Sequence, residues 1–92
     1  MGIKKIARPM NKAKNDWLKW LKDNNATNIE EFKGNTTGKD NFIYYRSVDA
    51  FIGDCLYIVI FMVWGSKIKI DYSDDHNKYE DMSIEDFLQM IT

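Results

Sequence analysis

The chain has 92 residues, 45% hydrophobic and 29% charged, which is the composition of one globular domain with a thin core and excludes a disordered chain. The formal net charge is only −1, yet residues 1–39 hold nine Lys or Arg against four Asp or Glu, and residues 40–92 hold four against ten. A single cysteine excludes an internal disulfide and a cysteine-based metal cage.

The first nine residues are predicted to be a basic, flexible arm, because they show no periodicity and end at Pro9, which starts a helix well but does not fit inside one. They contain no apolar stretch of signal-peptide length. Together with the single cysteine, Cys55, this favours a reducing, cytoplasmic location.

A helix is predicted over residues 10–24, where lysines and aspartates occupy the face opposite an apolar stripe. Lys12 and Lys19 each precede an aspartate by four residues, so these charges are expected to pair within the helix. The stripe consists of Met10, Ala13, Trp17, Leu18, Trp20 and Leu21.

A second, short helix of one to two turns is predicted over residues 29–34. Thr27 and Asn28 precede it as capping residues, acids occupy its first turn and Gly34 ends it. Ile29 and Phe32 are expected to face inward. The following residues, 34–40, resemble a phosphate-binding loop, but the spacing is one residue short and Asp40 replaces the required hydroxyl. This segment is therefore predicted to be a polar loop.

Three antiparallel strands are predicted next, over residues 41–49, 55–64 and 67–72, with residues 50–54 as the first turn. The central, ten-residue apolar strand is too short to cross a membrane, which needs roughly 20 residues, so no membrane association is expected. Gly65-Ser66 predicts a hairpin between the last two strands. Its register places these pairs on one apolar face: Val63 with Ile68, Phe61 with Ile70, and Val59 with Tyr72.

The opposite face of the central strand is also apolar, whereas its hairpin partner presents Lys67, Lys69 and Asp71 there. The central strand therefore needs a second cover, which could be a helix of its own chain, a second copy of the chain or a binding partner. If no helix covers this face, a homodimer is expected. The apolar residues concerned are Leu56, Ile58, Ile60, Met62 and Trp64.

A polar, mostly acidic loop is predicted over residues 73–81, followed by a helix over 83–91. The loop places oxygen ligands as a calcium loop does, but it has His76 where the sharp turn needs glycine and Met82 where the bidentate glutamate belongs. Ser83 is the expected cap of the helix. The predicted fold is thus α+β, one domain over residues 1–92, with a three-stranded antiparallel sheet and the order α-α-β-β-β-α.

No catalytic, cofactor or metal motif emerges, so the chain is expected to be a binding protein and not an enzyme, without a cofactor. The density of acids after residue 70 predicts a negative surface that could occupy a cation-rich, phosphate-binding groove on another protein. The apolar Met62 and Trp64 are a second candidate contact. The predicted acidic partner-binding residues are Asp71, Asp74, Asp75, Glu80, Asp81, Glu85 and Asp86.

In size and general character the chain resembles the small single-domain proteins of phages and mobile elements that bind and block host machinery, anti-CRISPR proteins among them. This resemblance implies a host protein as partner, such as a nucleic-acid enzyme or CRISPR effector. The alternatives are a toxin-neutralising immunity protein or a small DNA-associated regulator. Direct binding of nucleic acid would use the basic Lys4, Lys5, Arg8 and Lys12, and it is disfavoured by a pI near 5.7.

Overall fold

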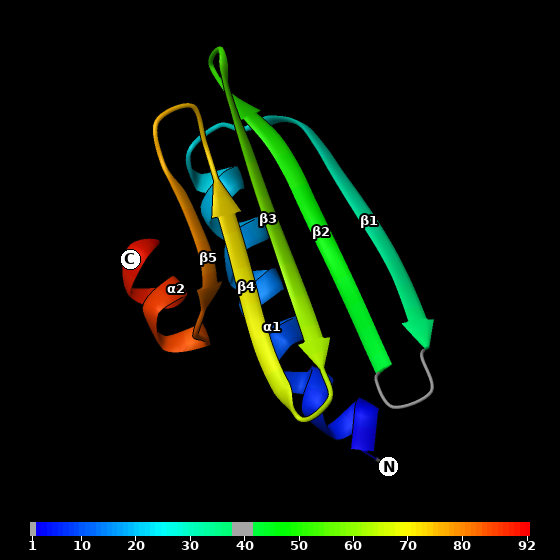
Figure 1. Ribbon diagram of the computed structural model, residues 1–92. Helices are drawn as coiled ribbons and strands as arrows, with labels where there is room; N and C mark the ends of the chain where they lie inside the picture. Colours follow the sequence, from blue (N-terminus) through cyan, green and yellow to red (C-terminus); the bar gives the residue numbers. More distant parts are fainter. Residues whose placement is uncertain (1, 38–41) are drawn as a thin grey trace.

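The five strands of the protein form one antiparallel sheet in sequence order, β1-β2-β3-β4-β5, with a helix at each end of the chain (Figure 1). The computed structural model describes residues 2–37 and 42–92. Each strand therefore pairs with the strand that follows it in sequence. The elements are α1 (Gly2–Asp23), β1 (Thr27–Thr37), β2 (Phe42–Ile52), β3 (Cys55–Trp64), β4 (Lys67–Ser73), β5 (Lys78–Met82) and α2 (Ile84–Met90).

Both helices lie on the same face of the sheet. The long helix α1 runs behind the strands and contacts β2, β3 and β4, whereas α2 lies beside β5 and contacts α1 and β4 (Figure 1). In residues 2–37 and 42–92 no helix lies on the other face. The fold therefore has two layers, and one face of the sheet is left open.

The core lies between the sheet and the helices, and Trp17 of α1 is at its centre. The Trp17 ring lies 5.8 Å from the Phe87 ring of α2 and 6.2 Å from the Tyr72 ring of β4. All six residues that the pattern predicts for the core are buried, and this prediction is confirmed. They are Trp17, Leu21, Val59, Phe61, Ile70 and Phe87.

The predicted three-stranded sheet and the order α-α-β-β-β-α are wrong, because the sheet has five strands and the chain has two helices. The predicted second helix is strand β1. Its chain turns at Asn28, where φ is +53°, and then pairs with β2 from Glu30 to Thr37. A helix of one to two turns is marginal in isolation, whereas a strand added to an open sheet edge gains cross-strand hydrogen bonds along its length.

Strand β1 also reverses the predicted orientation of Phe32. This side chain is 46% exposed, and it lies on the open face beside Ser47, its cross-strand neighbour. The predicted loop over residues 73–81 is wrong in its second half, because β5 begins at Lys78. The first turn is shorter than predicted and consists of Gly53 and Asp54.

Residues 2–9 of the predicted basic arm form the first two turns of α1, which contains Pro9. Proline removes one backbone donor, and its ring crowds the carbonyl four residues earlier, so a break was expected there. The neighbouring Lys, Ala and Arg residues have high helix propensity, which favours helix on both sides of the proline. The polar loop predicted over residues 34–40 is wrong over residues 34–37, which belong to β1, and its remaining residues lie outside the described part of the chain.

Three local predictions are confirmed. The hairpin between β3 and β4 turns at Gly65, where φ is +63°, and has the predicted register. The Ser83 side chain accepts a hydrogen bond from the backbone N–H of Asp86 and so caps α2. Within α1, Lys12 pairs with Asp16 at 3.3 Å and Lys19 with Asp23 at 2.8 Å.

Candidate interaction surfaces

The open face of the sheet carries a continuous apolar stripe. Strand alternation places every second residue of β3 on this face, since the residues between them are buried against the helices. Trp64 at the end of the stripe is 44% exposed, and the other members are partly exposed. The apolar residues of the open face are Phe32, Tyr45, Phe51, Leu56, Ile58, Ile60, Met62 and Trp64.

Charged residues of β4 flank this stripe. Lys69 lies beside Met62, and Asp71 lies beside Ile60. The Lys69 ammonium is 5.6 Å from the centre of the Trp64 ring, close enough for a cation–π contact. A shallow groove of about 190 Å³ follows, between the stripe and β5, and Asp71 and Glu80 are among the residues that line it.

A second surface, the acidic edge, lies along β5 and the start of α2, at the side of the sheet opposite β1 (Figure 1). Asp81 pairs with Lys69 at 3.8 Å and Glu80 with Lys78 at 4.0 Å, and both distances are at the long limit of an ion pair. Because Asp81 has φ +57°, its chain leaves the regular strand there. The acidic edge consists of Asp74, Asp75, Glu80, Asp81, Glu85 and Asp86.

One of these acids, Asp74, holds the turn between β4 and β5. Its carboxylate accepts hydrogen bonds from the backbone N–H of His76 and of Asn77, both at 2.8 Å, and from the Tyr72 hydroxyl. The Tyr72 hydroxyl bond, followed by the backbone bond from His76, lowers the pKa of Asp74. Burial, together with the bond to Asp74, raises the pKa of Tyr72. The Asp74 carboxylate is therefore part of the fold.

Folding does not neutralise the two halves of the chain against each other. Among the described side chains, five ion pairs form, and each joins two residues of the same half. Lys12, Lys14 and Lys19 pair with acids of residues 1–39, whereas Asp81 and Glu80 pair with lysines of residues 40–92. The segment 71–86 holds seven acids and one lysine, so it keeps an excess of negative charge.

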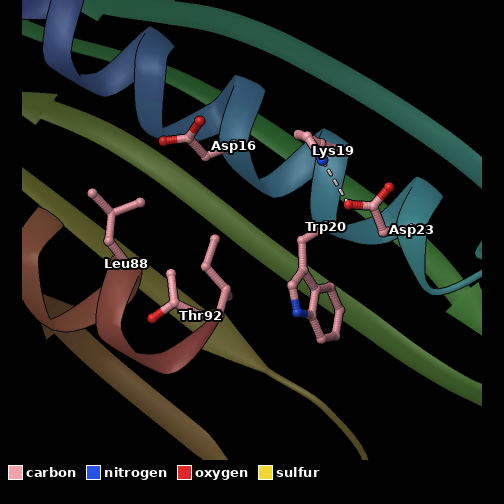
Figure 2. A pocket seen from close by; sticks show the side chains of 7 residues that line it. Asp16, Lys19, Trp20, Asp23, Leu88 and Thr92 are labelled. Carbon is pink, nitrogen blue, oxygen red and sulfur yellow. Dashed lines mark hydrogen bonds and ion pairs between the residues drawn. The ribbon is translucent and has the colours of Figure 1, made fainter.

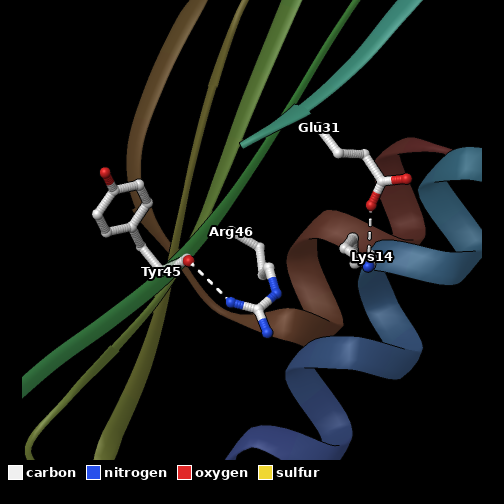
Figure 3. A network of polar contacts seen from close by, with 4 residues as sticks. All are labelled: Lys14, Glu31, Tyr45 and Arg46. Carbon is white, nitrogen blue, oxygen red and sulfur yellow. Dashed lines mark hydrogen bonds and ion pairs between the residues drawn. The ribbon is translucent and has the colours of Figure 1, made fainter. Parts of the chain in front are cut away.

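A basic cleft of about 460 Å³ lies at the other side of the molecule, where α1 approaches β1 and β2. Lys14 of α1 pairs with Glu31 of β1 at 3.1 Å, and Arg46 of β2 donates to the backbone carbonyl of Tyr45 (Figure 3). The Arg46 guanidinium also lies 4.3 Å from the centre of the Tyr44 ring. With Lys33, the cleft holds three cations and one carboxylate.

A notch of about 360 Å³ separates the C-terminal half of α1 from the end of α2 (Figure 2). Trp20 forms one wall, and its ring stacks on Trp17 at 5.1 Å. The Lys19–Asp23 ion pair lies at the rim, where the bond to Asp23 raises the pKa of Lys19. Thr92, just after α2, closes the notch on the other side. The charged side chains of the notch are thus engaged in ion pairs, Lys19 with Asp23 inside it and Asp16 with Lys12 outside it.

The structure divides the predicted partner-binding residues between two surfaces. Met62, Trp64 and Asp71 come together on the open face, with Glu80 at its border. The remaining acids extend from the β4–β5 turn to the first turn of α2. Strand β5, which has five residues and is roughly 16 Å long, lies between Asp75 and Glu85. They form one edge but no single cluster.

Sequence reasoning missed the contribution of β1 and β2 to the open face. Phe32 and Tyr45 belong to it, and the alternation Glu30-Glu31-Phe32-Lys33 was the available signal for a strand. The basic cleft was missed for the same reason, since Lys33 reaches it only from a strand. The side chains of Lys4 and Lys5 lie outside the described part.

In the part of the chain that the structure describes, no three His, Cys, Asp or Glu residues come together in a way that could hold a metal ion. His76 is exposed in the β4–β5 turn, and Cys55 is partly buried at the start of β3. None of the described helices combines the length and the apolar character needed to cross a membrane.

Comparison with known proteins adds no relative. No family model matches the chain, and no curated protein or solved structure is significantly similar to it.

Proposed function

We propose that this protein functions by binding another protein, and that its acidic edge docks into a cation-rich groove of the kind that holds nucleic-acid phosphates. A small phage or mobile-element protein of this type would inhibit a host nucleic-acid enzyme, a CRISPR effector being one example. The acids would take the positions of phosphates in the groove, so the inhibitor and the nucleic acid would compete.

The observation that carries this proposal is the separation of charge in the folded chain. Because each described ion pair joins residues of the same half, the excess of acid in residues 71–86 remains available to a partner. Asp75, Glu80 and Glu85 are exposed, and no backbone group donates a hydrogen bond to them in the described chain. A surface of one sign accelerates encounter with a surface of the opposite sign.

The test is capture of a partner from the lysate of the organism that carries the gene, followed by mass spectrometry. Immobilised wild-type protein is expected to retain a basic protein that heparin and duplex DNA release, since both are polyanions that compete for the same groove. The triple variant Asp75→Asn, Glu80→Gln, Glu85→Gln is expected to lose this protein. Capture should also weaken as salt rises, because exposed charges are screened over about 8 Å at physiological ionic strength.

A matched control changes the same number of acids elsewhere. The triple variant Asp23→Asn, Glu30→Gln, Asp54→Asn alters the net charge equally but leaves the acidic edge intact, so it is expected to capture the partner as the wild type does. If both triple variants capture the same protein with equal strength, the acidic edge is not the contact and the proposal fails.

A DNA-associated regulator would behave in the opposite way. It would bind duplex DNA in a fluorescence-anisotropy assay, and replacing Lys33 and Arg46 of the basic cleft by Gln would weaken that binding. The proposed inhibitor is expected to show no DNA binding at physiological salt.

A further inference from the structure

The open face has no cover from its own chain in the described structure. Both helices lie on the other face (Figure 1). On the open face, β3 leaves Trp64 exposed and Ile58, Ile60 and Met62 partly exposed in a continuous row. Soluble monomers rarely leave an apolar patch larger than a few hundred Å² exposed. This face therefore needs a second surface of similar shape and polarity.

We propose that the occupant is a second copy of this chain, and that the two sheets pack face to face. The two-fold axis lies in the plane between the sheets and runs perpendicular to the strands. The proposed function places the partner on the acidic edge, which this arrangement leaves accessible. The dimer would thus present two acidic edges, one from each copy. The proposal goes beyond the proposed function and does not depend on it.

The area of the open face is sufficient. Strand β3 has ten residues and is about 33 Å long, and four strands at about 4.8 Å spacing are about 19 Å wide. Two such faces in contact hide about 1,200 Å² in projection, the lower limit of specific protein–protein interfaces. Sheets that pack in this way lie about 10 Å apart, with side chains of both faces between them.

The charges on β4 select the orientation. Lys69 and Met62 lie in one cross-strand row, and Asp71 and Ile60 lie in the next, about 6.6 Å away along the strands. A two-fold axis that passes between these rows, perpendicular to the strands, exchanges them. Lys69 of each copy then faces Asp71 of the other, and Met62 faces Ile60 in the centre.

The other face-to-face arrangement, with the axis parallel to the strands, has no such match. When this axis runs along the central strand β3, it places Lys69 opposite Tyr45 and Asp71 opposite Ser47, because these residues share their rows on β2 and β4. The Asp71 carboxylate would then be buried in the interface opposite a serine and without a cationic partner, which is unfavourable. Charge complementarity therefore favours the perpendicular axis.

Sedimentation equilibrium on the full chain tests whether a dimer forms. The expected mass is about twice the 10.9 kDa of one copy. Ile60→Lys should reduce it to that of one copy, since the substitution places two like charges at the centre of the interface. Ile60 is on the open face, so this variant should keep the wild-type far-ultraviolet circular dichroism.

Exchanging the charges tests the arrangement. Lys69→Glu alone would place two carboxylates opposite each other on both sides of the axis, and Asp71→Lys alone would place two ammonium groups there. Each single variant should therefore sediment as a monomer. An equimolar mixture of the two should recover the dimer mass, because each Glu then faces the introduced Lys and each remaining Lys69 faces an Asp71.

Lys22→Glu and Asp75→Lys provide the control, since they make the same charge changes at exposed positions away from the open face. Both should remain dimeric, alone and mixed. A wild-type chain that stays monomeric at millimolar concentration would overturn the proposal, as would a dimer that survives Ile60→Lys. A dimer that Ile60→Lys disrupts but that both charge variants retain would overturn the perpendicular axis.

Discussion

Gly34 and Tyr45 are cross-strand neighbours on β1 and β2, and the glycine leaves room for the tyrosine ring. A Cβ atom at Gly34 would lie 2.7 Å from the Tyr45 hydroxyl oxygen and 2.8 Å from two ring carbons, which is closer than atoms can approach. The hydroxyl end of the ring therefore packs against the glycine backbone. An aromatic side chain of this kind compensates for the poor strand propensity of glycine.

We expect the effect of Gly34→Ala on the free energy of unfolding to depend on Tyr45. In a Tyr45→Ala background the substitution should stabilise the protein by about 0.5–1 kcal/mol, because alanine loses less backbone entropy in a strand. In the wild-type background this gain should disappear, since the ring must move. Urea denaturation of the four proteins measures the coupling, and equal effects in both backgrounds would show that ring and glycine do not touch.

Asp74 should make the stability of the protein depend on pH in the acidic range. Because hydrogen bonds from Tyr72 and the backbone lower its pKa below the ordinary value of 3.8, its ionised form stabilises the native state above about pH 4. This stabilisation is lost as the pH falls below about 4.

Asp74→Asn should therefore lower Tm at neutral pH, and its difference from the wild type should shrink below about pH 4. Thermal unfolding between pH 2 and 7 measures this. Asp75→Asn is the control, since it removes an exposed carboxylate from the same turn without removing a described hydrogen bond. If Asp74→Asn lowers Tm equally at every pH, the carboxylate does not act through its charge.

At the scale of elements, β1 and α2 show why this sequence could be interpreted only in part. Asn28-Ile-Glu-Glu-Phe and Ser83-Ile-Glu-Asp-Phe share the same capping pattern, yet the first begins a strand and the second begins a helix. The difference lies in the tertiary contacts of the two segments. β1 pairs with the edge of β2, whereas α2 buries Phe87 against Phe61, with 5.3 Å between the centres of the two rings.

Elements with a strong period were predictable. The stripe of α1 and the β3–β4 hairpin were found because the buried side chains follow periods of 3.6 and 2. β5 could not be found in this way, since its five residues bury no side chain and its pairing with β4 is irregular. The absence of cover on the open face was also undetermined, because a sequence does not show which face of a sheet a helix will choose.

The cap of α2 is expected to determine whether this short helix forms. Ser83→Ala removes the acceptor for the Asp86 N–H and should cost about 1 kcal/mol of the free energy of unfolding, or about 4–8 °C in Tm. Ser66→Ala, in the exposed β3–β4 turn, should change Tm little. Equal effects of the two substitutions would indicate that the Ser83 bond does not stabilise α2.

At the scale of the whole molecule, the acidic edge and the open face differ in how far they follow from sequence. The excess of acidic over basic residues after residue 70 can be counted in the sequence. Whether this negative charge is neutralised in the folded protein depends on which lysines pair with which acids. Asp74 shows the limit of counting, since three donors engage its carboxylate in a turn. Composition predicts the number of charges, whereas only the fold shows which carboxylates accept hydrogen bonds within the chain and which are exposed.

A single core joins the two helices to the sheet, so the protein should unfold in one cooperative step. Trp17 of α1 contacts rings from α1, β3, β4 and α2, and loss of any of these elements would alter its surroundings. Its indole N–H is buried and meets no acceptor among the described groups. Trp17 should therefore fluoresce at short wavelength in the native state and shift to longer wavelength on unfolding.

The double variant Trp20→Phe, Trp64→Phe leaves Trp17 as the one tryptophan and makes this test specific. Its fluorescence and the far-ultraviolet circular dichroism of the backbone should give the same urea midpoint and slope, because both report one all-or-none transition. The double variant should keep the core, since Trp64 is on the open face and phenylalanine retains an aromatic ring beside Trp17. A fluorescence transition at lower urea than the circular dichroism transition would mean that the helices detach before the sheet unfolds, in which case the protein lacks a single core.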